Sequence, residues 1–219
     1  MSIRHIIWDW NGTLLDDLHA ALQAVNTMLG RRGLPPLTRA AYREIFGLPV
    51  RPFYIKAGFV LENEDWDALA REFHTLFLAD SSIRLYPQVP ALLAELGARG
   101  ISHSLLSVSK QSILDTLTRR YGIENRFDRI RGVDNLNGIS KMDLGRDLLR
   151  ELPFPPQEIL MVGDTLHDAE VACGLGLPCL LVAAGHQSEK RLRSSGFPVI
   201  GSLDEIPVRL GHASPVRKI

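Results

Sequence analysis

Residues 6–17, IIWDWNGTLLDD, join an apolar run to a cluster of polar residues. A short apolar run ends at Asp9, and Asn11, Gly12 and Thr13 follow almost at once. Such a run, bounded by polar and turn residues, is typical of a buried strand. Ligands of open parallel sheets bind beyond the carboxyl ends of the strands. The polar residues after this strand are therefore candidates for a functional site, although an Asn-Gly pair is also a strong turn signal.

Further apolar runs predict that this strand belongs to a larger sheet. The predicted strands span residues 3–9, 101–107, 158–164 and 178–184, with weaker candidates at 127–132 and 198–200. Helical periodicity fills the gaps between most of them, and several of these helical segments end in glycine, as helices often do. The alternation of strand and helix predicts an α/β core: a Rossmann-like, doubly wound parallel sheet covered on both faces.

One long segment after the first strand interrupts this alternation and contains only helical patterns. These patterns cover residues 17–33, 38–58 with a break at 47–52, and 63–80. Asn63 is the expected N-cap of the last helix. We therefore expect residues 1–16 plus 84–219 to form the α/β core domain, and residues 17–83 to form an inserted all-helical cap domain.

The composition is that of an ordinary globular protein. Of the 219 residues, 45% are hydrophobic, and 25 basic residues offset 25 acidic ones. A chain without net charge has no overall field that attracts nucleic acid or an anionic membrane, so we expect neither as a partner. The sequence shows no signal-peptide pattern and no apolar run long enough to span a bilayer. We expect a cytoplasmic protein that is a monomer or a homodimer.

Polar residues end three of the predicted strands. They are Asp9, Ser107 and Asp164, and a further acid, Asp168, follows within GDTLHD, residues 163–168. Carboxylates held on neighbouring strands repel one another unless a cation or a shared proton lies between them. A hard divalent cation with oxygen ligands removes this repulsion, and Mg²⁺ is the usual one where phosphate is handled. The cysteines and histidines, by contrast, show no paired spacing typical of a zinc site.

These motifs resemble those of the haloacid dehalogenase-like superfamily. The matching residues are DWNGT (9–13), Ser107, Lys141 and GDTLHD (163–168), which occur in that superfamily's order and rough spacing. The helical insertion is similar to the helical cap of phosphoglycolate phosphatase-like members. The resemblance implies a Mg²⁺-dependent phosphatase of small phosphorylated metabolites, such as phosphoglycolate-like phosphomonoesters.

The resemblance also implies a role for each motif residue. Asp9 is the implied nucleophile, which attacks phosphorus and forms an aspartyl-phosphate. Mg²⁺ would bind Asp9, the backbone carbonyl of Asn11 and Asp164, with Asp168 as a direct or water-mediated ligand. The implied phosphate-binding groups are the Ser107 hydroxyl, the Lys141 ammonium, and the backbone N–H groups of Gly12, Thr13 and Val108.

Two assignments have open alternatives. Ser109 takes the place of Ser107 if the alignment is shifted by two residues. The cap loop FGLPVRPF, residues 46–53, is a candidate for substrate selection, with Arg51 as a candidate anion contact. An ordinary interhelical turn is an equally good interpretation of this loop.

Asn11 departs from the family pattern, in which an aspartate at this position protonates the leaving group and then activates water. An amide does neither, and loss of a general acid–base group costs about 10²- to 10⁴-fold in rate. Three hypotheses follow. In the first, the protein is a phosphatase that is slow or takes a substrate with an acidic leaving group. In the second, it is a phosphonatase-like C–P bond hydrolase that uses a cap lysine, Lys56. In the third, it binds phosphometabolites without turnover.

Overall fold

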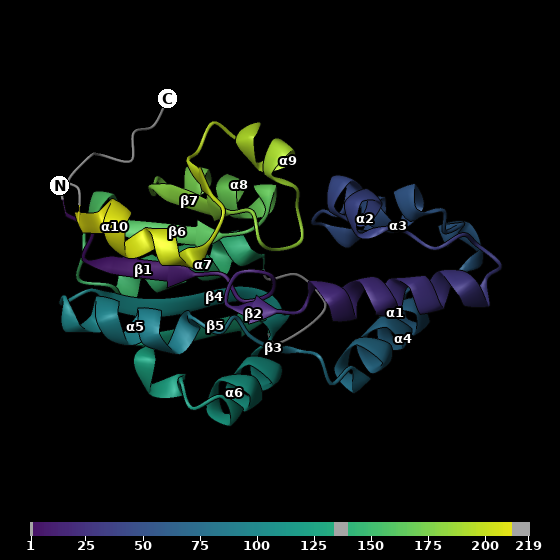
Figure 1. Ribbon diagram of the computed structural model, residues 1–219, viewed down its shortest axis with the longest axis horizontal. Helices are drawn as coiled ribbons and strands as arrows, with labels where there is room; N and C mark the ends of the chain where they lie inside the picture. Colours follow the sequence, from purple (N-terminus) through teal and green to yellow (C-terminus); the bar gives the residue numbers. More distant parts are fainter. Residues whose placement is uncertain (1, 134–139, 212–219) are drawn as a thin grey trace.

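The computed structural model describes residues 2–133 and 140–211. Its main element is a six-stranded sheet in which all neighbouring strands are parallel. In spatial order the strands are β5 (Arg129–Val133), β4 (Ser102–Lys110), β1 (His5–Trp8), β6 (Ile159–Gly163), β7 (Cys179–Val182) and β8 (Val199–Ile200). All six predicted strands are present (Figure 1), and β4 continues to Lys110 instead of ending at Ser107.

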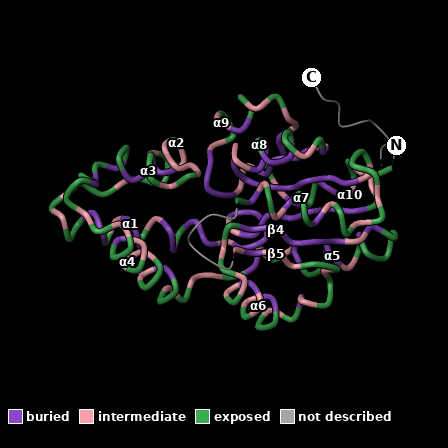
Figure 2. Tube along the Cα trace, turned by 180° about the vertical axis from the view of Figure 1, so that it is seen from behind, coloured by how far each residue is buried: buried purple, intermediate pink, exposed green. Residues whose placement is uncertain are grey.

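Helices cover both faces of the sheet, which confirms the predicted doubly wound fold. One face packs on α5 (Val89–Ala98), α6 (Gln111–Arg120) and α10 (Ile206–Gly211), and the other on α7 (Lys141–Glu151), α8 (Leu166–Leu175) and α9 (Glu189–Arg193). Successive residues of a strand point to opposite faces of the sheet. In β1, Ile6 and Trp8 pack with residues of α5, α6 and α10, and Ile7 packs with residues of α7, α8 and α9. Figure 2 shows the buried residues gathered between the two helix layers. This burial on both faces explains why the strands read as apolar runs.

Four further helices form the segment predicted as a cap and lie together at one end of the molecule (Figure 1). They are α1 (Leu18–Arg31), α2 (Arg39–Ile45), α3 (Val50–Ala57) and α4 (Trp66–Ala79). Val25, Tyr42, Phe53 and Leu69 belong to an apolar cluster that these helices share. Among the helices that the structure describes, none is long and apolar enough to cross a membrane.

The start of α4 differs from the prediction. Asn63 ends a short 3₁₀ turn, η1 (Leu61–Asn63), so the chain turns once more before the helix begins. Asp65 is the N-cap, and its carboxylate accepts hydrogen bonds from the backbone N–H groups of Asp67 and Ala68.

Elsewhere in the described residues, short 3₁₀ turns are η2 (Glu124–Arg126), η3 (Pro156–Glu158) and η4 (Leu203–Glu205).

A short antiparallel strand pair that the sequence does not predict joins the two parts of the chain. In it, β2 (Leu15–Asp16) pairs with β3 (Arg84–Leu85). Two residues per strand are too few to produce a recognisable alternation. The predicted domain boundaries, at 16/17 and 83/84, fall at this pair, and the division into two domains there stays a prediction.

We expect Leu69→Ala in α4 to loosen the cap and leave the sheet intact. Leu69 is 1% exposed within the cap's own cluster, and such truncations cost about 2–5 kcal/mol. Hydrogen exchange measured by mass spectrometry should quicken within residues 18–79 alone. Leu93→Ala in α5 is the matched control: Leu93 is also 1% exposed, but it lies in a core cluster, and its truncation should quicken exchange across the sheet. Equal acceleration of both parts by Leu69→Ala would argue against a separate cap.

Candidate active site

The register of the sheet places the ends of β1, β4 and β6 next to one another. Trp8, the last residue of β1, pairs with Leu105 of β4 and with Val162 of β6. The backbone N–H of Asp9 donates to the carbonyl of Val162 at 2.9 Å. Asp9 is therefore fixed at the edge of the sheet where ligands of parallel α/β proteins bind.

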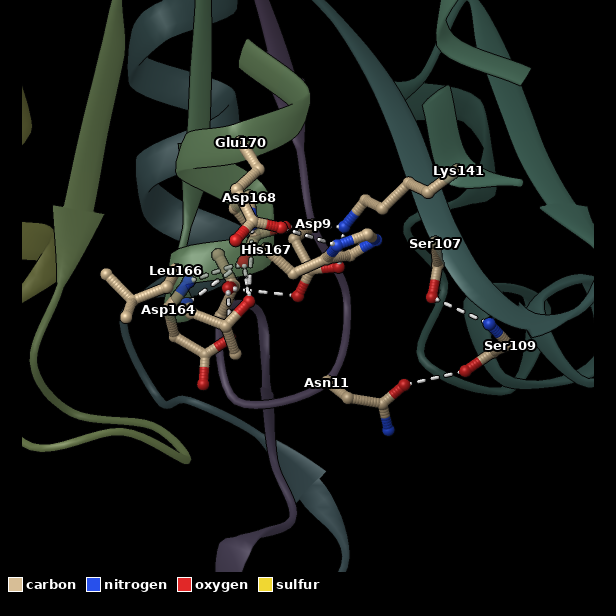
Figure 3. A network of polar contacts seen from close by, with 12 residues as sticks. Asp9, Asn11, Ser107, Ser109, Lys141, Asp164, Leu166, His167, Asp168 and Glu170 are labelled. Atoms are coloured by element: carbon tan, nitrogen blue, oxygen red, sulfur yellow. Dashed lines mark hydrogen bonds and ion pairs between the residues drawn. The ribbon is translucent and has the colours of Figure 1, made fainter. Parts of the chain in front are cut away.

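Three buried carboxylates meet at this edge. One oxygen from each of Asp9, Asp164 and Asp168 lies within 4.8 Å of the other two. Asp9 is 6% exposed and the other two are more deeply buried. The hydroxyl of Thr13 lies 3.2 Å from a carboxylate oxygen of Asp9 and 3.3 Å from one of Asp164. The fold thus brings together all the side chains predicted as metal ligands (Figure 3).

Lys141 begins α7 and reaches into this carboxylate cluster. The helix starts there because Ser140 caps it, with its hydroxyl accepting the backbone N–H of Asp143. The Lys141 ammonium donates to Asp9, as the resemblance implies, and also to Asp168 at 2.6 Å. Burial disfavours the charged ammonium, but Asp168 and Asp9 outweigh it and raise the pKa of Lys141 above its ordinary value. The lysine is therefore charged.

Asp168 holds both Lys141 and the first turn of α8. One of its oxygens accepts from Lys141, and the other accepts the Thr165 hydroxyl at 2.7 Å and the Thr165 backbone N–H at 3.0 Å. The preceding Gly163 makes room, since a Cβ there would lie 2.2 Å from the Asp168 carboxyl carbon. Burial opposes ionisation, yet Lys141 lowers the pKa of Asp168 below its usual value. Both oxygens of Asp168 therefore have protein partners.

Asn11 is hydrogen-bonded on both sides of its amide. Its nitrogen donates to Asp17 at 2.6 Å, and its oxygen accepts the Ser109 hydroxyl at 2.6 Å. Figure 3 shows the amide oxygen turned towards Ser109. An amide donates and accepts at once, whereas an ionised carboxylate only accepts. The position between an acid and a hydroxyl therefore suits asparagine.

A second buried ion pair, between Asp17 and His186, is not predicted by the sequence patterns. The His186 ring nitrogen lies 3.1 Å from an Asp17 oxygen that also accepts the Gly12 backbone N–H, and the His186 backbone N–H donates to Asp164 at 2.6 Å. Burial disfavours the charge, but Asp17 outweighs it, and the pKa of His186 rises to about 9. One signal was available: His186 comes two residues after the predicted strand 178–184, at the same edge of the sheet.

The backbone donors of the Asn-Gly turn have partners within the protein, and their role in binding phosphate stays a prediction. The N–H of Gly12 donates to the carbonyl of Leu15 at 2.9 Å, and that of Thr13 donates to the carbonyl of Trp10 at 3.3 Å. Gly12 has a φ of 73°, and a Cβ there would lie 2.2 Å from an Asp164 oxygen. The turn therefore requires glycine to let Asp164 approach.

A cavity of about 350 Å³ adjoins the carboxylates, between the core and the cap helices. Ser107, Val108 and Ser109 line its core side, and the Ser107 hydroxyl oxygen accepts the Ser109 backbone N–H at 3.1 Å. Four residues of the loop 46–53 line its cap side: Phe46, Leu48, Val50 and Phe53. Arg51 does not line it. Its guanidinium is exposed and lies 5.5 Å from the ring centre of Trp66, which does line the cavity, and the role of Arg51 as an anion contact stays a prediction.

The charges of the site fit a divalent cation. Among the described residues, four buried carboxylates face two buried cations; these are Asp9, Asp17, Asp164 and Asp168 against Lys141 and His186. Burial is the main reason why the pKa values of Asp164 and Asp9 are raised, and a neighbouring carboxylate adds to it in each case. With all four carboxylates ionised, two negative charges would be unbalanced; a hard dication would balance them and favour the ionised forms of these oxygen ligands. The donor set therefore fits Mg²⁺.

A parallel sheet with an inserted helical segment, and with buried carboxylates and a lysine at its carboxyl edge, defines a class of α/β proteins with an acidic site. The chain belongs to the haloacid dehalogenase-like hydrolase family, whose model matches residues 6–182. This confirms the family that the motifs predict.

Named relatives extend this comparison. A 5'-nucleotidase from Pseudomonas aeruginosa is 28% identical over 197 residues, 87% of each chain. A phosphoglycolate phosphatase from Yersinia pestis is 26% identical over 203 residues, 89% of this chain and 87% of its own. The crystal structure described as a predicted phosphatase from Clostridium acetobutylicum has the same fold, with a TM-score of 0.80 and 20% identity over 96% of this chain and 99% of its own.

We expect Asn11→Asp to destabilise the protein, because the new carboxylate would face that of Asp17 and lose the donor that joins them. The cost should be about 1–3 kcal/mol, a fall in Tm of about 2–12 °C for a chain of this size. The exchange Asn11→Asp with Asp17→Asn keeps one amide and one carboxylate in contact, but it also removes the charge that faces His186, so it should restore only part of the Tm. An unchanged Tm in the single variant would contradict this contact.

We expect Mg²⁺ to bind and stabilise the protein through Asp164. Calorimetric titration should show a severe loss of Mg²⁺ affinity in Asp164→Ala and a smaller loss in Asp168→Ala, because Asp168 is already paired with the Lys141 ammonium, whereas the hydrogen-bond partners of Asp164 are a hydroxyl and a backbone N–H. Mg²⁺ should also raise the Tm of the unaltered protein, since a ligand of the folded state stabilises it. Undiminished affinity in both variants would refute this site.

Proposed function

We propose that the protein is a Mg²⁺-dependent phosphatase of small phosphorylated metabolites, and that it acts through an aspartyl-phosphate on Asp9. The observation that carries this proposal is the buried contact of Asp9 with Lys141, beside Asp164 and Asp168, at the floor of the cavity. Membership of a hydrolase family and relatives named as phosphatases support a phosphoric monoester hydrolase.

The residues at the carboxylate end of the cavity have different roles in phosphoryl transfer. Asp9 supplies the carboxylate oxygen that attacks phosphorus, and the Lys141 ammonium offsets the charge on the transferred group. Ser107 donates its hydroxyl proton to a phosphoryl oxygen, because its own oxygen already accepts from Ser109. Mg²⁺, held by Asp9, Asp164 and the Asn11 carbonyl, would supply the positive charge that makes the phosphoryl group electrophilic.

The amide of Asn11 leaves the first step without a general acid at that position. Its N–H group donates to Asp17, and it has no proton to give near neutral pH. Turnover should therefore be slow unless the leaving group departs without protonation.

Two alternatives stand beside the phosphatase. A phosphonatase-like mechanism needs a cap lysine in the cavity, but Lys56 is exposed on α3 and is not among the described residues that line it. A protein that binds phosphometabolites without turnover is separated from a phosphatase only by measuring activity. A cytoplasmic location and a monomeric or homodimeric state stay predictions.

We expect Asp9→Asn to reduce Mg²⁺-dependent phosphate release by about 10³-fold or more, because it removes the nucleophile. The measurement is a screen of phosphomonoesters with Mg²⁺ and with a chelator. Asp16→Asn is the matched control, since Asp16 pairs with Arg84 at the strand junction and is not among the cavity-lining residues. A folded Asp9→Asn protein with more than a few per cent of the activity would contradict the covalent mechanism, and absence of release from every ester would favour the binding protein.

A further inference from the structure

The cap side of the cavity is apolar and aromatic. Its larger residues include Phe46, Phe53, Tyr54, Trp66, Phe73 and Phe77. Phe46 and Phe53 meet edge to face at a centroid distance of 5.3 Å, and Phe73 and Phe77 stack at 5.6 Å. Aromatic rings arranged in this way offer faces and edges on which a further flat ring packs well.

The helices of this wall contribute no aspartate, glutamate, lysine or arginine. Among the described lining residues within α1 to α4 and the loops between these helices, His74 is the most polar; Asp17, just before α1, also lines the cavity but pairs with His186. On the core side, Lys141 is already paired with Asp9 and Asp168, and Lys110 is exposed at the end of β4. A substrate carboxylate, as in phosphoglycolate, that lay against this wall would lose water without gaining a cationic partner from α1 to α4, because burial and Lys110 lower the pKa of His74 and favour its neutral form. Lys110 is the lining cation nearest to this wall, and it lies on the core side.

The amide at Asn11 restricts the substrate independently of this wall. Without a general acid at that position, the leaving oxygen must depart as an anion or take its proton from water. A phenol has a pKa of about 10, as in tyrosine, so a phenolate is a far better leaving group than an alkoxide. An aromatic group bonded to phosphate through oxygen therefore satisfies both the wall and the amide.

We propose that the substrate is an aryl phosphomonoester whose uncharged aromatic group packs against the cap wall while its phosphate binds beside Asp9; this rests on the phosphatase function proposed above. An Asp9 oxygen forms a bond to phosphorus as the bond from phosphorus to the aryl oxygen breaks. The electron pair leaves on the phenolate, which takes a proton from water. A water molecule then attacks the aspartyl-phosphate and releases inorganic phosphate and the Asp9 carboxylate.

The first test compares three phosphate esters of phenols with one another and with phosphoglycolate, whose leaving group is an alkoxide. We expect kcat/KM for 2-naphthyl phosphate to exceed that for 4-carboxyphenyl phosphate by about tenfold or more, with phenyl phosphate between them. Phosphoglycolate, which lacks both the ring and the acidic leaving group, should be slower than 2-naphthyl phosphate by about 100-fold or more. Equal or faster turnover of 4-carboxyphenyl phosphate or phosphoglycolate would overturn the proposal.

A charge placed on the wall tests whether the wall causes this preference. Leu78 lines the cavity from α4 and is 51% exposed, so Leu78→Lys should fold. It should raise the ratio of kcat/KM for 4-carboxyphenyl phosphate over that for phenyl phosphate by about threefold. Ile55→Lys is the matched control, because Ile55 is 58% exposed on α3 and is not among the cavity-lining residues. An equal change in both variants, or in neither, would contradict selection by the wall.

Binding separates failure of this inference from failure of the phosphatase. In calorimetric titrations with Mg²⁺, (2-naphthylmethyl)phosphonate should bind about tenfold more tightly than phosphonoacetate, which carries the carboxylate of phosphoglycolate. Neither compound has a leaving group, so the comparison reports on the cavity alone. Tighter binding of the naphthyl compound without any turnover would refute the phosphatase and support the aryl ligand. Equal or tighter binding of phosphonoacetate would refute the aryl ligand even if esters are hydrolysed.

Discussion

Surplus negative charge, buried at the carboxyl edge of the sheet, is the constraint on which the site depends. Parallel β1 and β6 place Asp9 and Asp164 next to each other, where little water reaches them. Buried carboxylates are stable only when cations or donors face them. Lys141 faces Asp9, and the backbone N–H of His186 faces Asp164. The start of α7 and the loop after β7 therefore meet one electrostatic requirement, and a divalent cation would complete the balance of charge.

The same loop after β7 also holds the cap over the site. The Tyr42 hydroxyl of α2 lies 3.1 Å from a ring nitrogen of His186, and Arg43 donates to the carbonyl of Gln187 at 2.7 Å. The Gln187 side chain donates in return to the carbonyl of Phe46 at 2.9 Å. Phe46 belongs to the aromatic wall of the cavity. The position of this wall is thus tied to the residues that stabilise the buried carboxylates.

Asn11 shows how one residue serves the fold and limits the chemistry. Its amide donates to Asp17 and accepts from Ser109, so it links the loop after β1 to the start of α1 and to the end of β4. The contacts that make an amide suitable there are the same ones that leave the position without an acid. The aromatic wall and the amide together favour a substrate that is flat, uncharged outside its phosphate and easily released.

The sequence alone predicts the order of strands and helices and the helical insertion. It also predicts the residues that meet at the carboxyl edge of the sheet: Asp9, Asp164, Asp168 and Lys141. Apolar runs and helical periodicity are local properties, and acids at the ends of parallel strands must share one edge of the sheet. Only the tertiary structure decided that His186 pairs with Asp17, 169 residues away.

Local patterns also left three details of the fold and the site open. The tertiary structure sets the partners of the N–H groups in the turn at Gly12, the place of Arg51 over the ring of Trp66, and the pairing of β2 with β3. No periodicity records such details, because they depend on how segments distant in sequence pack together and on the phase at which a helix begins.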